Sequence, residues 1–225
     1  MKKVMIFLSS MAFVLFTLPA HAQFGGLGGL LGGGSSGGGA GDIDGQVKSF
    51  VDGSVQINNL VVSSLSAINA AYASDSDAAQ IRAKADAYAK ATDPKEKDAL
   101  AAEIVKTQSA KLEELTKSTD AVERTKKLDA TKRKQVLDSL VNFGIGALRA
   151  VGLTDTGKSI VSSIGSNPMN ITKVVPVKDA LPLLADAISI STKVIPGYYK
   201  VLRGANIEPP KITAETKPVT DLKIE

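Results

Sequence analysis

Apolar residues recur every three or four positions between residues 44 and 73, and this spacing constrains the fold more than any other feature. At 3.6 residues per turn they share one face of a helix. The 22 residues 53–74 carry no charge, which raises the question of a membrane span. Gln56, Asn58, Asn59 and Asn69 would be costly in hydrocarbon, so we predict the central helix of a bundle. The apolar stripe comprises Phe50, Ile57, Val61, Leu65, Ile68 and Tyr72.

Cap residues divide the following sequence into further helices. Ser74 or Asp75 can begin one helix. The run Asp93-Pro94-Lys95-Glu96 combines an N-cap, a proline at the first helical position and a glutamate three residues after the cap. The helix that starts there should reach Lys127, a length of roughly 50 Å at 1.5 Å per residue. Asp129 should begin another helix that ends at Gly152.

Beyond Gly152 the apolar spacing is less regular. We predict a short helix over 156–164, an extended stretch over 171–177, a helix over 180–195 and a last turn over 198–202. Gly144 and Gly146 would be tolerated where another helix crosses closely. The expected fold class is all-α: a five- or six-helix bundle with one long charged helical hairpin, a flexible glycine-rich N-terminal linker and an extended C-terminal tail.

The N-terminus has the pattern of a secretory signal. Lys2 and Lys3 precede an apolar stretch, and Ala20-His21-Ala22 matches the small-x-small site that signal peptidase recognises. An uncleaved membrane anchor is the alternative, but the apolar run is short for a span. We expect cleavage between Ala22 and Gln23 and a periplasmic or secreted location.

The chain is therefore expected to have four parts. They are a signal peptide over 1–22, a glycine-rich linker over 23–43, a helical domain over 44–204 and an extended tail, rich in proline and charge, over 205–225. The linker should be flexible because glycine loses much backbone entropy on folding. Phe24 and the leucines among its glycines are unusual for a plain spacer, and a docking element is the alternative.

The residues that remain after cleavage limit the reactions that the protein could catalyse and the metals that it could bind. His21 is the only histidine and leaves with the signal, and the chain has no cysteine and no tryptophan. Serine–histidine and cysteine–histidine hydrolase mechanisms and thiolate or imidazole metal sites are therefore excluded. We expect no enzyme activity, no catalytic residues, no metal and no cofactor. With no disulfide, stability must come from packing.

One motif suggests a nucleotide. Gly152, Gly157, Lys158 and Ser159 match the phosphate-loop pattern GxxxxGK[ST]. That loop needs a strand before it and a helix after it, whereas an amphipathic helix is predicted before Gly152. We therefore do not expect nucleotide binding, and we read Gly152 as a helix C-cap.

Six basic residues gather around the predicted junction near Asp129, and they are the candidate contact with an anionic lipid or another polyanion. A solvated turn between two helices is the alternative. Residues 130–206 hold 10 basic and 4 acidic residues, a balance of +6. Nucleic acid is not expected, because stacking aromatics do not interleave with the basic residues. The six are Arg124, Lys126, Lys127, Lys132, Arg133 and Lys134.

These observations predict an exported, non-enzymatic helical protein that binds or scaffolds through helix surfaces, with a protein partner or by self-association. The alternative function is a membrane-active or lipid-carrying helical protein that uses the apolar, basic half over 130–206.

Overall fold

The computed structural model describes residues 43–164, 168–213, 215–220 and 222–224. The signal peptide and most of the linker predicted above lie outside these residues. The described elements are six α-helices and one 3-10 helix, with no strand among them, so the all-α class is confirmed. They are α2 (Ile43–Tyr72), α3 (Asp75–Lys90), α4 (Pro94–Lys117), α5 (Ala121–Lys126), α6 (Ala130–Ile164), η1 (Pro168–Val174) and α7 (Val175–Gly204).

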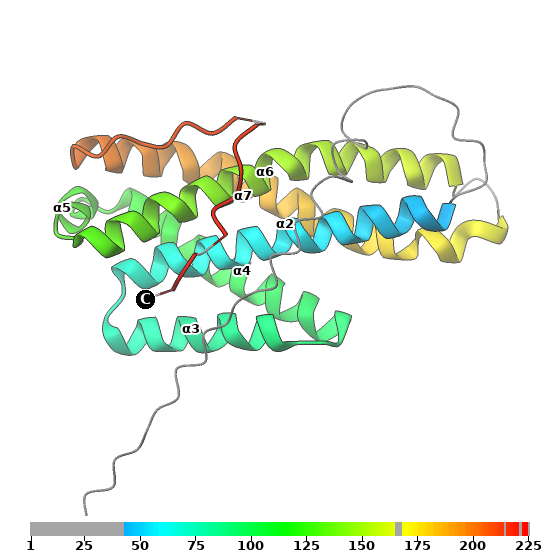
Figure 1. Ribbon diagram of the computed structural model, residues 1–225, viewed down its shortest axis with the longest axis horizontal. Coiled ribbons are helices and arrows are strands. Elements are labelled where there is room, and N and C mark those ends of the chain that lie inside the picture. Colours follow the sequence, from blue (N-terminus) through cyan, green and yellow to red (C-terminus); the bar gives the residue numbers. More distant parts are fainter. Residues whose placement is uncertain (1–42, 165–167, 214, 221, 225) are drawn as a thin grey trace, which may run out of the picture.

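α2 is the central helix, as its apolar stripe predicts. It packs against α3, α4, α6 and α7, and Figure 1 shows α3 on one side of it and α6 on the other. Phe50, Ile57, Val61 and Ile68 are buried in the main core. Ser64, Ser66 and Asn69 are buried too, because neighbouring helices cover the polar face of the helix over its C-terminal half.

The predicted helix from Asp93 to Lys127 is wrong in its second part. The cap at Asp93 is confirmed, since its carboxylate accepts from the backbone N–H of Glu96 at 2.9 Å. α4 ends at Lys117, which makes it about 36 Å long. Ser118 takes an extended backbone, and its hydroxyl donates to Asp120. Three consecutive capping residues, Ser-Thr-Asp, compete with the helix here and redirect the chain into α5.

The predicted helix end at Gly152 is also wrong, because α6 runs unbroken for 35 residues. Its second half is held by packing. A Cβ on Gly157 would lie 2.5 Å from Cε2 of Phe50, so this turn lies directly against α2. The phosphate-loop letters therefore fall inside one helix, with no strand before them. The loop that would curl around a phosphate is therefore absent from residues 152–159, which are helical throughout.

Residues 171–177 are helical rather than extended, and the two elements expected after them form the single helix α7. The helix contains Pro182 and Pro196, and each proline removes one backbone hydrogen bond at a cost of about 3 kcal/mol. Both prolines lie on the exposed side. The buried side offsets this cost through seven apolar residues: Val177, Leu184, Ala187, Val194, Tyr198, Val201 and Leu202.

The C-terminal tail is extended, as predicted, and it packs across the bundle (Figure 1). A Cβ on Gly144 would meet Ile212 of the tail, whereas one on Gly146 would meet Val61 of α2. Only Gly146 therefore serves the predicted helix crossing. Asn142 holds the tail with both side-chain atoms: its amide donates to the carbonyl of Val219 at 2.9 Å, and its oxygen accepts from the N–H of Val219 at 2.7 Å.

Candidate functional site

Four of the six basic residues of the predicted anion contact have hydrogen-bond or ion-pair partners within the bundle. Lys126 pairs with Glu123 at 2.7 Å and Lys134 with Asp138 at 2.5 Å. Arg133 and Arg124 each donate to a backbone carbonyl, those of Leu128 and Tyr72. Lys127 and Lys132 form no ion pair within the described part of the chain. Much of the positive charge therefore has partners nearby in the bundle. Arg124 lies at a different site, beside the C-terminus of α2.

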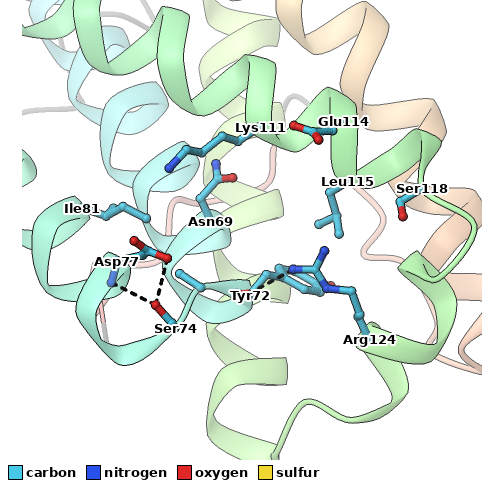
Figure 2. A pocket seen from close by; sticks show the side chains of 11 residues that line it. Asn69, Tyr72, Ser74, Asp77, Ile81, Lys111, Glu114, Leu115, Ser118 and Arg124 are labelled. Atoms are coloured by element: carbon cyan, nitrogen blue, oxygen red, sulfur yellow. Dashed lines mark hydrogen bonds between the residues drawn. The ribbon is translucent and has the colours of Figure 1, made fainter.

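That site is a pocket of about 420 Å³ at the end of the bundle, where α2 ends and α3 begins. α4 and α5 close its other sides (Figure 2). Its size lies within the range of small-molecule sites. It is lined by Asn69, Tyr72, Ala73, Ser74, Asp77, Ile81, Lys111, Glu114, Leu115, Ser118 and Arg124.

Tyr72 forms a fixed wall of the pocket. Its ring meets the ring of Tyr198 edge to face, with centroids 6.2 Å apart. The hydroxyl of Tyr198 donates to that of Tyr72, which lies 2.9 Å from the hydroxyl of Thr125. Thr125 in turn donates to the carbonyl of Ala121 at 2.8 Å. This chain of hydroxyls joins α2, α5 and α7, and burial raises the pKa of both tyrosines above the ordinary value of 10.0.

Arg124 lies over this wall. Its Nη2 donates to the carbonyl of Tyr72 at 3.2 Å, and its guanidinium carbon lies 5.8 Å from the centroid of the Tyr72 ring. The first contact satisfies a carbonyl at the C-terminus of α2, where a cation is favourable, and the second is a cation–π contact. Because these contacts leave other guanidinium N–H groups free to donate, Arg124 can still bind an anion.

Asn69 forms the inner surface. It is 93 % buried, and its Nδ2 donates to the carbonyls of Leu65 and Gln108, at 2.9 Å in each case. Its Oδ1 accepts no hydrogen bond from the described residues. The two donated bonds fix the orientation of the amide, so this oxygen is a positioned acceptor in the pocket (Figure 2).

The rim is set by the start of α3 and the end of α4. Ser74 caps α3 as predicted, because its hydroxyl accepts from the N–H of Asp77 at 3.3 Å and donates to the carboxylate of Asp77 at 2.8 Å. Lys111 and Glu114 project from α4 and form no ion pair within the described part of the chain. Beside the pocket, a more open hollow of about 520 Å³ shares Glu114 and Ser118 with it, but its Glu113 and Lys117 pair with each other at 2.6 Å.

The pocket can therefore hold a small polar molecule through charges of both signs and one fixed acceptor. No group of three or more acidic, histidine or cysteine residues within the described ranges could hold a metal ion. Of the six basic residues selected from the sequence, only Arg124 lines the pocket. The other lining residues come from two segments, 69–81 and 111–118, and no sequence pattern links these two segments into a site.

Comparisons with known proteins do not place this site in a family. No family model matches the chain, and no curated protein and no solved structure matches it significantly.

Proposed function

We propose that the protein is exported and is a non-enzymatic binding protein whose recognition site is the pocket between α2, α3, α4 and α5. The proposal rests on the charged side chains of the pocket, which have no ion-pair partners among the described residues. Lys111, Glu114 and Arg124 line the pocket without ion pairs among the described residues, beside the positioned acceptor of Asn69. A polar ligand could form ion pairs and hydrogen bonds with these unpaired side chains. Export is supported by the signal pattern over 1–22.

The lining favours binding over catalysis. Asp77 and Glu114 are its carboxylates, and they project from different helices (Figure 2). Asp77 is engaged in the cap of α3 with Ser74. Acid–base catalysis by paired carboxylates, as in glycoside hydrolysis, needs two carboxyl groups that flank one bond. Hydrogen bonding and charge complementarity are the chemistry that these residues offer.

The membrane-active alternative is less well supported. Within the described ranges, Ala130–Ser163 is the one helix that is long and apolar enough to cross a membrane. Core helices of soluble proteins have the same length and composition, and 61 % of its apolar window is buried inside the bundle. Burying one Leu, Ile or Val side chain stabilises by roughly 1.5 to 3 kcal/mol, against about 1 kcal/mol for a basic residue at an anionic membrane. Packing is therefore favoured over membrane insertion.

A thermal-shift panel of small cations, anions and zwitterions tests the proposal. At least one class should raise the melting temperature of the wild-type protein by several degrees, since a ligand at about 100 times its dissociation constant stabilises by about 2.7 kcal/mol. Replacing both Glu114→Gln and Arg124→Gln should abolish that shift. Lys106→Gln, an exposed position on α4 outside the pocket, is the matched control and should keep it.

Equal responses of the wild-type protein and the double variant to every class would contradict the proposed site. The export part has its own test in the intact mass of the exported protein. The measured mass should correspond to a chain that begins at Gln23. A mass that includes residues 1–22 would contradict export.

A further inference from the structure

We infer that the ligand of this pocket is a small zwitterion, namely an α-amino acid or a short peptide with an aliphatic side chain. This inference rests on the proposed function and specifies its substrate class. It is carried by the signs of the charges around the pocket, by the acceptor of Asn69 and by the apolar part of the lining.

The charges disfavour ligands of one sign. A simple anion that reached Arg124 and Lys111 would also lie near the carboxylates of Asp77 and Glu114. A simple cation that reached Asp77 and Glu114 would likewise lie near the positive charges of Lys111 and Arg124. Charge complementarity selects partners through such repulsion as well as through attraction. A molecule with one positive and one negative end satisfies both sets.

The positions of the side chains give the ligand a direction. Figure 2 shows Glu114 on one side of Leu115 and Arg124 on the other, with Asn69 across from them on α2 and Lys111 extended towards α3. The ligand carboxylate would lie against the free N–H groups of Arg124. Its ammonium group would donate to Glu114 and to the Oδ1 of Asn69, which needs a donor.

The remaining lining suits a short aliphatic group. Ala73 and the exposed edges of Ile81 and Leu115, which are 4 % and 6 % exposed, supply a small apolar surface. The face of Tyr72 is already occupied by Arg124, so it does not offer a stacking surface for an aromatic ligand. A volume of about 420 Å³ accommodates a molecule of the size of leucine or leucyl-leucine.

Calorimetric titration of the full exported chain with four probes tests the inference. The probes are leucine, leucyl-leucine, leucinamide, which lacks the carboxylate, and N-acetylleucine, which lacks the ammonium group. Leucine or leucyl-leucine should bind with a dissociation constant in the micromolar to millimolar range. Leucinamide and N-acetylleucine should each bind about tenfold more weakly or worse, because each leaves one charged partner unmet.

Single variants separate binding roles from structural ones. Arg124→Gln should weaken leucine about tenfold and leave the weak binding of leucinamide unchanged, since leucinamide has no carboxylate to lose. Glu114→Gln should weaken leucine and leave N-acetylleucine unchanged. A merely structural effect would weaken all probes alike, and that pattern would overturn the inference.

Other outcomes distinguish this inference from the proposed function. If N-acetylleucine or inorganic phosphate binds as tightly as leucine, the pocket takes anions, and the zwitterion inference fails while the binding function stands. If leucinamide binds as tightly as leucine, the pocket takes cations, with the same consequence. If neither these probes nor any class in the thermal-shift panel binds, both the inference and the proposed function are wrong.

Discussion

Gly157→Ala should destabilise the protein, whereas Gly152→Ala on the same helix should stabilise it. Alanine normally gains about 0.5 to 1 kcal/mol over glycine inside a helix, and half-buried Gly152 should show that gain. At Gly157 the added Cβ would lie 2.5 and 2.8 Å from ring atoms of Phe50 and 2.9 Å from Leu181. Phe50 is fully buried and cannot move aside, so overpacking of about 1 to 3 kcal/mol outweighs the helical gain.

Urea unfolding followed by circular dichroism measures both variants, provided that the m-value is unchanged. The unfolding midpoint should fall for Gly157→Ala and rise for Gly152→Ala. A lower midpoint for Gly152→Ala would mean that Gly152 is a C-cap with a left-handed backbone, as the sequence suggested, and that α6 is two helices.

Raising the pH above about 10 should unfold the protein cooperatively. Burial raises the pKa of Tyr72, Tyr88 and Tyr198 above the ordinary value of 10.0. The folded state then holds these protons more tightly than the unfolded state. Their contribution to stability is complete below pH 10 and is lost as the pH rises from there towards the raised pKa values. While all three stay protonated in the folded state, the loss is at most roughly 4 kcal/mol per pH unit, against a typical total stability of 5 to 15 kcal/mol.

The check is to follow tyrosinate absorbance and helical circular dichroism together as the pH is raised. The larger part of the tyrosinate signal should rise together with the loss of helix, because Tyr72, Tyr88 and Tyr198 ionise only when the bundle opens, whereas the fourth tyrosine, Tyr199, is only half-buried. Gradual ionisation centred near pH 10 with the helical signal intact would contradict the burial of the three hydroxyl groups.

The starts of α3, α4 and α6 could be predicted from the sequence, since their caps depend on local chemistry. The caps at Ser74, Asp93 and Asp129 all form hydrogen bonds with the backbone three residues later. The apolar stripe of α2 could be predicted because residues three or four positions apart lie on the same face of a helix, and an apolar face is buried.

Helix ends were less predictable, because tertiary contacts decide them. α6 continues past Gly152 because its next turns pack on Phe50, and α7 continues through Pro182 and Pro196 because its other face is buried. Both conflicts between local preference and packing were resolved in favour of packing.

The candidate site could not be predicted from the sequence, apart from Arg124. Asn69 contacts Gln108 across 39 positions, Arg124 contacts Tyr72 across 52, and Tyr198 contacts Tyr72 across 126. No local spacing encodes such pairs. The break at Ser118 to Asp120 was the one local signal, since those residues commonly cap helices, and it is this break that brings Arg124 back to the end of α2.

The claim that the pocket is the recognition site is tested most directly by mapping where a ligand binds. Two-dimensional amide NMR spectra of the mature protein should be recorded while leucine is added. We expect shifts concentrated at Tyr72, Ala73, Lys111, Glu114 and Arg124, with the first turns of α6 around Lys132 unchanged. Shifts confined to Lys132, Arg133 and Lys134, or to the tail around Val219, would place binding elsewhere and contradict the account.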